Sequence, residues 1–244
     1  IDTIQWTPLV GYIKKNYNPK IIDGEGHGGQ SNLFIYPEGN IVKKQFVLKK
    51  HIKMIKYRIE KNTLIRLPYH ENIIQLLGFN DITSSIYIPY YNGLSLFYVI
   101  CKRDLTSTKI TLPEFKSLGY QLLNAIEHIH NNNIVHMDIK PENILVDNGR
   151  YILSDFGMAY TKHKNNNSIT YFSWRGSHGY LPPEKTYMKL NGIIPWNIIT
   201  KTDIWGLGII LFMIIEGYNL FYNGHTEKST RVYNAFEDKL NLTC

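Results

Sequence analysis

The segment HMDIKPEN, residues 136–143, places three polar side chains of different chemistry within six residues. Asp138 can accept a proton, Lys140 can neutralise negative charge, and Asn143 offers an amide oxygen to a metal ion. Because apolar residues flank the segment, it either caps a strand as a simple turn or forms a loop that handles a hydroxyl, a phosphate and a metal. The rest of the chain must decide between these interpretations.

A second acidic turn begins twelve residues after Asn143. The tripeptide DFG, 155–157, follows the short strand-like run YILS. Asp155 could simply cap this turn. Together, however, Asn143 and Asp155 supply two hard oxygen ligands, which a Mg²⁺ ion held partly by substrate phosphates requires.

Four glycines, Gly24, Gly26, Gly28 and Gly29, lie between two runs that are typical of strands. Glycine lets the backbone approach a phosphate closely and present its N–H groups to it. A flexible hairpin would show the same cluster, and no helix follows it, so the dinucleotide-binding fingerprint is not met. The functional interpretation is a flap that folds over a nucleotide.

Two adjacent lysines, Lys43 and Lys44, follow an apolar pair in a predicted strand. Since side chains alternate across a strand, one of the two must face away from the solvent. A buried ammonium without a partner is costly, so that lysine needs an acid. We assign the inward position to Lys43, with Glu60 of the following helix as its partner, and expect Lys44 to face the solvent.

Two differently built halves are needed to position these residues. Residues 1–89 alternate strand-like runs with turns, including strands at 73–79 and 84–91, and contain one helix at 51–67. Residues 90–244 contain an amphipathic helix at 112–133 and an almost wholly apolar one at 203–217, which we expect at the centre of the core. We therefore predict an α+β fold with a small β-rich N-terminal lobe, 1–89, and a mainly helical, short C-terminal lobe, 90–244.

The composition limits the classes of partner and compartment. The net charge of +7 suits anionic ligands, but no basic block accompanies it, so we do not expect nucleic acid as the primary ligand. Two cysteines, Cys101 and Cys244, suit a reducing intracellular compartment, either cytoplasm or nucleus. The start does not have the pattern of a signal peptide, and the longest apolar run, 207–215, is too short to span a membrane, so we expect no membrane association. Nothing in the sequence indicates an oligomeric state.

Taken together, these motifs resemble those of the eukaryotic-type protein kinases. GEGHGG is similar to the glycine-rich loop, IVK to the strand that carries the ATP-anchoring lysine, HMDIKPEN to the catalytic loop and DFG to the metal-binding turn. GSHGYLPPE, 176–184, resembles the substrate-docking segment, with Pro182 in place of alanine, and DIWGLG from residue 203 resembles the start of the central helix. The resemblance covers about residues 20–217 and implies the bilobal kinase fold.

The resemblance also implies a reaction, the in-line transfer of the ATP γ-phosphoryl group to a hydroxyl of a protein substrate. Asp138 would orient the hydroxyl and accept its proton, and Lys140 would neutralise charge on the transferring group. Ser177 matches the hydroxyl residue that contacts both. A lysine two residues after the catalytic aspartate is typical of the Ser/Thr branch of the family.

ATP and Mg²⁺ are the implied cofactors, with Asn143 and Asp155 as the metal ligands. In IYIPYY, Ile88 falls at the gatekeeper position, Pro89 can offer adenine only a carbonyl, and Tyr91 N–H would be the complementary donor. The residues expected around the nucleotide are Gly24, Gly26, Gly29, Lys43, Glu60, Ile88, Pro89 and Tyr91.

The catalytic-loop segment differs from the family pattern at one position. Met137 replaces an arginine that in the family often binds a phosphate on the activation loop, so we expect activity without phosphorylation of Ser168, Thr170 or Ser173. The alternatives are a catalytically weak pseudokinase scaffold and a small-molecule phosphotransferase of the antibiotic- or choline-kinase type, which lacks the docking segment. The small size, the frequent Asn, Ile, Lys and Tyr residues and the tetrapeptide PPEK, 182–185, resemble those of compact kinases of large DNA viruses. For such a protein the expected location is the host cell.

Overall fold

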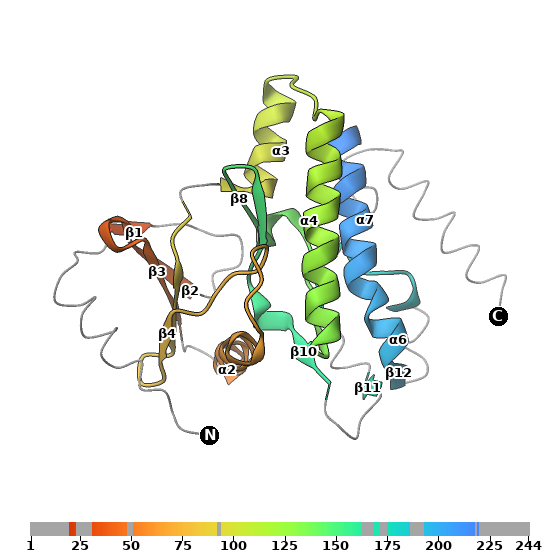
Figure 1. Ribbon diagram of the computed structural model, residues 1–244. Helices are drawn as coiled ribbons and strands as arrows, with labels where there is room; N and C mark the ends of the chain where they lie inside the picture. Colours follow the sequence, from red (N-terminus) through yellow and green to blue (C-terminus); the bar gives the residue numbers. More distant parts are fainter. Residues whose placement is uncertain are drawn as a thin grey trace.

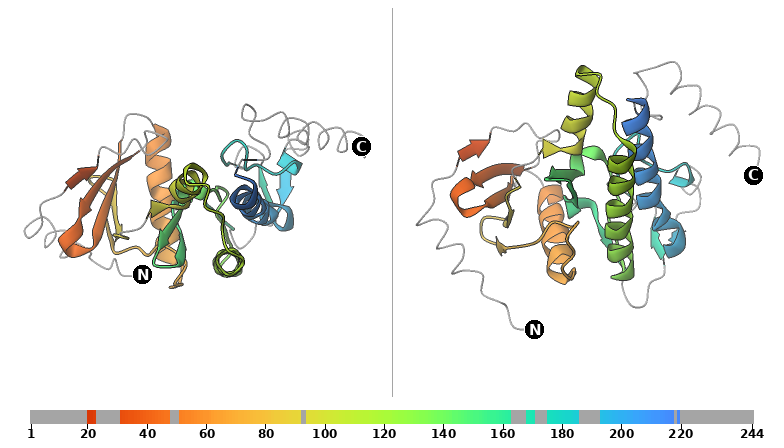
Figure 2. Two further views of the ribbon diagram at one scale, coloured as in Figure 1. Left: turned by 90° about the horizontal axis from the view of Figure 1, so that it is seen from above. Right: turned by 45° about the horizontal axis from the view of Figure 1, so that its top comes forward.

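The computed structural model describes residues 20–22, 31–47, 51–91, 94–162, 168–170, 175–185, 193–217 and 219. In this part of the chain a small sheet with one helix lies beside a group of helices that includes α4 and α7 (Figure 1). Seen from above, the two halves stand next to each other, with the short green strands between them (Figure 2).

The first half is built on a five-stranded antiparallel sheet. Its spatial order is β1-β2-β3-β5-β4, so the third strand lies at the centre. The strands are β1 (Lys20–Ile22), β2 (Ser31–Tyr36), β3 (Ile41–Phe46), β4 (Gly78–Asn80) and β5 (Ser85–Pro89), with a single 3-10 turn, Pro37–Gly39, between β2 and β3. One face of this sheet packs against the helix that follows β3.

That helix, α2 (His51–Arg66), packs against the sheet through Tyr57 and Leu64, which are both buried in the core. The Tyr57 ring meets the ring of Phe46 on β3 edge to face, with 5.5 Å between the centroids. Helix α2 also contacts the turn Phe156–Met158, which belongs to the DFG segment. The helix predicted at 51–67 is confirmed to within one residue at its end.

In the part of the second half that the structure describes, the helices are α3 (Leu96–Leu105), α4 (Leu112–Asn131), α6 (Trp196–Ile199) and α7 (Lys201–Glu216). Helix α4 begins with a capping box in which Glu114 N–H donates to the Thr111 hydroxyl and Thr111 N–H donates to the Glu114 carboxylate. Helices α4 and α7 lie side by side (Figure 1), and their facing apolar residues form much of the core.

Helices α6 and α7 together, Trp196–Glu216, are long and apolar enough by length and composition to cross a membrane. A core helix of a folded domain meets the same criteria. Leu207 and Ile210 of α7 belong to the main core cluster, where they pack with residues of α4.

The described part of the chain also contains three small antiparallel sheets. They consist of β6 (Leu94–Ser95) with β8 (Ile144–Asp147) and β9 (Arg150–Leu153), of β7 (Ile134–Val135) with β10 (Tyr160–Thr161), and of β11 (Ser168–Thr170) with β12 (Ile193–Pro195). The last of these sheets, β11 with β12, lies beside α6 (Figure 1). Residues 136–143 connect β7 to β8, and the DFG turn connects β9 to β10. Since β8 pairs with β9 and β7 with β10, these two loops must lie next to each other.

The predicted α+β class, with a β-rich first half and a helical second half, is confirmed. The strand predicted at 73–79 is wrong for most of its length, because Ile73 forms only an isolated bridge to Leu153 and β4 begins at Gly78. Helix α3 was not predicted. Its apolar residues Leu96, Val99 and Ile100 have the three-and-four spacing of a helix, and they pack in or against the core.

Candidate active site

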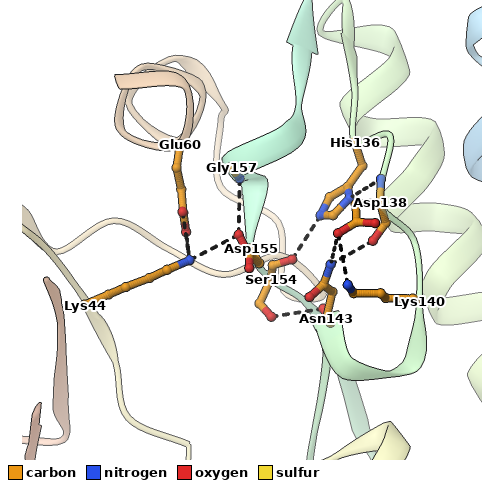
Figure 3. Close-up of polar contacts among 9 residues, drawn as sticks. All are labelled: Lys44, Glu60, His136, Asp138, Lys140, Asn143, Ser154, Asp155 and Gly157. Carbon is orange, nitrogen blue, oxygen red and sulfur yellow. Dashed lines mark hydrogen bonds and ion pairs between the residues drawn. The ribbon is translucent and has the colours of Figure 1, made fainter. Parts of the chain in front are cut away.

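Lys44 links the sheet, helix α2 and the DFG turn in one ionic cluster (Figure 3). Its ammonium nitrogen lies 2.8 Å from Oε2 and 3.0 Å from Oε1 of Glu60 on α2. The same nitrogen lies 3.1 Å from Oδ1 of Asp155, which also accepts a hydrogen bond from Gly157 N–H at 3.3 Å. Lys44 of the first half thus binds Glu60 of the same half and Asp155 of the second half.

The predicted pairing of Lys43 with Glu60 is wrong by one residue. Lys43 lies on the opposite face of β3, where its ammonium contacts Oε1 of Gln45 at 3.1 Å and sits 4.8 Å from the centre of the Phe34 ring. Phe46 sets the parity of the strand, because it packs on Tyr57 of α2 and Lys44 is two residues away on the same face. The position proposed for the ATP-anchoring lysine therefore passes to Lys44.

The two acids that share Lys44 differ in proton affinity. Burial raises the pKa of Glu60 to about 7, although the Lys44 ammonium opposes this effect. Partial desolvation by the surrounding protein also works against ionisation of Asp155, but the charge and hydrogen bond of Lys44, together with Gly157 N–H, hold its pKa at about 2. Asp155 is therefore the more firmly ionised of the two, and its side chain is 49 % exposed, so it can still receive a cation from solution.

Asp138 is the centre of a second polar cluster, in the loop between β7 and β8. Its Oδ1 accepts a hydrogen bond from Ser177 N–H at 2.9 Å, and its Oδ2 lies 3.3 Å from the Lys140 ammonium. Lys140 in turn donates to the Ser177 hydroxyl at 2.7 Å. The structure thus brings Asp138, Lys140 and Ser177 into mutual contact, although Ser177 is far from the other two in the sequence.

Asn143 is tied to the same aspartate through its amide nitrogen. Nδ2 donates to the main-chain oxygen of Asp138 at 2.8 Å and to Oδ2 of Asp138 at 3.1 Å. The Asn143 main-chain oxygen accepts from both the N–H and the hydroxyl of Ser154, next to Asp155. Because the amide nitrogen is occupied, the amide oxygen is the atom of Asn143 that remains for a metal ion.

Asp203 at the start of α7 holds the loop in place and was missed by the sequence analysis. Its fully buried carboxylate accepts the backbone N–H groups of His136 at 2.9 Å and Met137 at 2.8 Å, and it contacts Nε2 of His130 at 2.9 Å. These bonds hold Met137 at a φ of 65°, a conformation that non-glycine residues adopt rarely. The available signal was an acid in the first turn of an otherwise apolar helix, since a buried charge requires partners.

His136 connects this loop to the DFG turn. Its Nε2 contacts the main-chain oxygen of Ser154 at 2.9 Å, and its ring meets the fully buried ring of Phe156 with centroids 4.7 Å apart. Asp138 N–H donates to its Nδ1 at 3.2 Å. Asp138 and Asp155 are therefore held in a fixed relation by one buried imidazole (Figure 3).

Met137 lies in an apolar cluster under the docking segment. Its buried side chain packs with Val135, Ile194 and Ile199, against which Trp196 also lies. Gly176 in this segment has a φ of 136°, and a Cβ added there would lie 2.8 Å from the main-chain oxygen of Met137. Only glycine allows this close approach, which brings the neighbouring Ser177 to Asp138.

The expected adenine-binding residues lie at the end of the central pair of strands. Ile88 and Pro89 close β5, opposite Val42 and Ile41 of β3, and half-buried Tyr91 follows two residues later. Tyr90 N–H donates to the main-chain oxygen of Asn40 at 2.8 Å, so it is not available to a ligand. The assignment of Tyr91 N–H as the adenine donor remains a prediction.

Several predicted residues lie outside the described part of the chain. These are Gly24, Gly26, Gly28 and Gly29 of the glycine-rich segment and Ser173 of the activation loop. Of the other activation-loop positions, Ser168 and Thr170 are the ends of β11.

The donor set fits a magnesium ion that is shared with a nucleotide. Among the described residues no group of three or more His, Cys, Asp or Glu side chains could hold a metal by itself. Mg²⁺ commonly takes one or two protein oxygens and completes its shell with phosphates and water. The partly exposed carboxylate of Asp155 and the amide oxygen of Asn143 match that requirement.

The small sheet with its helix and the helical half, joined by the two clusters, form the bilobal α+β arrangement of the protein kinases. Comparison with known proteins agrees, because residues 18–242 match the family described as "Protein kinase domain". The chain belongs to the protein kinase domain family.

The similar curated proteins are protein kinases from several eukaryotes. CBL-interacting protein kinase 11 of Oryza sativa is 30% identical over 165 residues, which is 66% of this chain and 31% of that protein. The cAMP-dependent protein kinase type 3 of Saccharomyces cerevisiae is 29% identical over 189 residues, 75% of this chain and 44% of that protein. Serine/threonine-protein kinase PKH2 of Candida albicans is 30% identical over 229 residues, 87% of this chain and 22% of that protein. The chain therefore spans less than half the length of each of these relatives.

Proposed function

We propose that this chain is an ATP-dependent protein kinase that transfers the γ-phosphoryl group to serine or threonine hydroxyls of protein substrates. One observation carries the proposal. The Lys44–Glu60–Asp155 cluster and the Asp138–Lys140–Ser177 cluster meet at two adjacent loops, which carry Asp155 and Asp138 and which His136 joins through Ser154 and Phe156. A phosphate-binding cation, a proton acceptor and two metal ligands are the parts that phosphoryl transfer requires.

Each residue has a role that its surroundings support. Lys44, held by Glu60, binds the α- and β-phosphates, and Asn143 and Asp155 hold Mg²⁺, which neutralises phosphate charge when it is bound. Asp138 orients the substrate hydroxyl and takes its proton, while Lys140 stabilises negative charge on the group in transfer. Fixed positions are important here, because catalysis of this kind depends on charges that are already in place.

Ser/Thr specificity is the finer part of the proposal. It is supported by Lys140, which binds the Ser177 hydroxyl at 2.7 Å and Asp138 at 3.3 Å, because a lysine at this position is typical of the Ser/Thr branch. The name of the similar serine/threonine-protein kinase PKH2 agrees with this branch. We further propose an intracellular location, in cytoplasm or nucleus, which the free thiol of Cys101 supports.

The test is transfer of label from γ-labelled ATP to a generic protein acceptor in the presence of Mg²⁺. We expect labelled serine or threonine with the wild-type protein, and a rate lower by about 10²–10⁴-fold in Asp138→Asn, which keeps the size but loses the base. Asp147→Asn is the matched control, since the hydrogen bonds of that aspartate in the described part of the chain are with Asn148 and Arg150 of the β8–β9 turn. It should behave like the wild type.

The other outcomes separate the alternative functions. Nucleotide binding without transfer by the wild type would indicate a pseudokinase scaffold and overturn the proposal. Transfer to a small hydroxyl compound but not to protein would indicate a small-molecule phosphotransferase. Label on tyrosine alone would contradict the Ser/Thr assignment and leave protein kinase activity in place.

A further inference from the structure

Helix α2 is attached to the sheet by polar groups at a second place besides Lys44. The attachment point is Asp81, in the turn between β4 and β5. Its Oδ1 accepts a hydrogen bond from the Tyr57 hydroxyl at 2.8 Å and lies 2.6 Å from the Lys61 ammonium. Both donors are on α2, so a single carboxylate holds two successive turns of the helix.

The turn that carries Asp81 is itself well fixed. Ser84 N–H donates to the Asp81 main-chain oxygen at 3.4 Å, and Thr83 N–H donates to the Asn80 side chain at 3.1 Å. The Ser84 main-chain oxygen accepts from Phe46 N–H on β3 at 3.0 Å. The carboxylate is therefore presented to α2 by a framework that is bonded to the same strand as Lys44.

Helical geometry couples this attachment to the active site. Tyr57 and Lys61 are four residues apart and Glu60 is three residues after Tyr57, so all three lie on one side of α2. A rotation or outward shift of the helix that removes Glu60 from Lys44 also removes Tyr57 and Lys61 from Asp81. The free energy of the Asp81 contacts consequently adds to that of the Lys44–Glu60 pair in favour of one helix position.

The charges of α2 make such a partner necessary. The helix contains five basic residues, Lys53, Lys56, Arg58, Lys61 and Arg66, and a single acid, Glu60. The Lys61 ammonium also lies over the Phe79 ring of β4, 4.8 Å from its centre, and its side chain is only 15 % exposed. Asp81 supplies the negative charge that this largely covered ammonium requires.

We propose that Asp81 is a positioning residue for the kinase reaction, which acts through Tyr57 and Lys61 to keep Glu60 on Lys44. The inference rests on the proposed function, because its purpose is to hold the phosphate-binding lysine ready before ATP arrives. Asp81 touches neither nucleotide nor substrate in this arrangement.

The kinetic signature follows from population shift. Without the Asp81 contacts, a larger fraction of the free protein has α2 displaced, and the apparent affinity for nucleotide falls in proportion to the fraction that remains in place. Bound MgATP favours the position with Glu60 on Lys44 and restores it. Removal of Asp81 should therefore raise KM for MgATP by about three- to tenfold and change kcat less than about twofold. Simple loss of folded protein would lower kcat and leave KM unchanged.

The experiment compares Asp81→Ala, Asp81→Asn and Tyr57→Phe with the wild type. Asn keeps an acceptor for the Tyr57 hydroxyl, so its effect should lie between those of wild type and Ala, and Tyr57→Phe keeps the ring packed on Phe46. Asp147→Ala is the matched control, because that acid holds Arg150 at 3.0 Å in a comparable turn of the other half. A second readout is hydrogen exchange of the α2 backbone without nucleotide, which we expect to be about five- to thirty-fold faster in Asp81→Ala, with α4 unchanged.

A background variant shows whether the effect passes through Glu60. In Glu60→Gln the additional change Asp81→Ala should alter KM for MgATP less than about twofold, because the pair to be positioned is already lost. Equal effects in both backgrounds would overturn the proposal, as would faster α2 exchange with an unchanged KM, or no change in either readout. Hydrogen exchange needs no transfer, so a wild-type protein without kinase activity would refute the proposed function while unchanged α2 exchange would refute the role of Asp81.

Discussion

The choice between Lys43 and Lys44 gives the sharpest test of the active-site geometry. Lys44→Met removes an ammonium whose side chain is 11 % exposed and which contacts two carboxylates at 2.8 and 3.1 Å. Lys43→Met removes a neighbouring ammonium on the other face of the same strand, which contacts Gln45 and the Phe34 ring. The two variants have the same chemistry, one position apart, so their difference isolates the direction of the side chain.

The expected effects differ by about two orders of magnitude. Loss of one fixed charge that stabilises phosphates costs about 3–4 kcal/mol in transition-state binding, or 10²–10³-fold in rate. The stability loss in Lys44→Met should be about 3 kcal/mol, which is the lower end for a broken buried pair. The loss is limited because burial already raises the pKa of Glu60 to about 7, so this acid can take up a proton when its partner is removed. For Lys43→Met we expect about 0–1 kcal/mol of stability and a rate within about threefold of wild type.

The assay is kcat/KM for MgATP at fixed protein acceptor, together with urea unfolding of each variant. Circular dichroism at the assay temperature establishes that both variants are folded. A large loss in Lys43→Met with a near-normal Lys44→Met would refute the assignment of Lys44. Equal losses in both would show that the face of β3 does not decide which lysine binds the phosphates.

Three further predictions test the supporting structure. In Asp203→Asn, the new amide N–H₂ faces backbone N–H donors, so we expect a loss of about 1–3 kcal/mol in urea unfolding; a change below about 0.5 kcal/mol would contradict the role of that carboxylate. Because Met137 is packed in an apolar cluster, replacing Ser168, Thr170 and Ser173 by Ala should leave the kinase rate within about threefold, and a loss beyond about tenfold would refute this. The Thr111 N–H bond and Arg103 hold the pKa of Glu114 at about 2, so its contribution to stability is present above pH 4.5 and is lost as the pH falls towards 2. Glu114→Gln should therefore lower the free energy of unfolding in urea at pH 7 by up to about 1 kcal/mol, because the side chain is 45 % exposed. This difference should shrink at pH 3, and a constant difference would contradict the assignment.

Residue order and local pattern were sufficient to predict the fold class and the loops that carry Asp138 and Asp155. The apolar spacing within a long periodic segment such as α4 is enough to predict the helix. The two loops were predictable because HMDIKPEN and DFG follow one another in the sequence in a characteristic order and spacing. Strand 73–79 was overpredicted, because Ile73 and Ile74 are buried in the core without belonging to the sheet. An apolar run indicates burial, and it does not indicate which neighbour provides the burial.

The lysine assignment failed for a related reason. Both faces of β3 are covered by apolar groups, since Ile41 packs with Tyr36 and Tyr87 on one side and Phe46 packs with Tyr57 on the other. The apolar pair before the lysines therefore did not distinguish the faces. The last two residues of the strand do distinguish the faces, because Phe46 is apolar and Gln45 is polar. Lys44 shares its face with Phe46, which lies on the side of α2.

Asp203 and Asp81 show what a sequence motif does not reveal. Each is a carboxylate outside the catalytic-loop and DFG motifs, yet each accepts from two or more donors on a segment that carries an active-site residue. Asp203 fixes the backbone on one side of Asp138, and Asp81 holds the face of α2 from which Glu60 projects. Because phosphoryl transfer depends on charges fixed in advance, the work of these two acids is done before any substrate binds. The active-site motifs define which groups react, and these distant carboxylates determine whether those groups are in position.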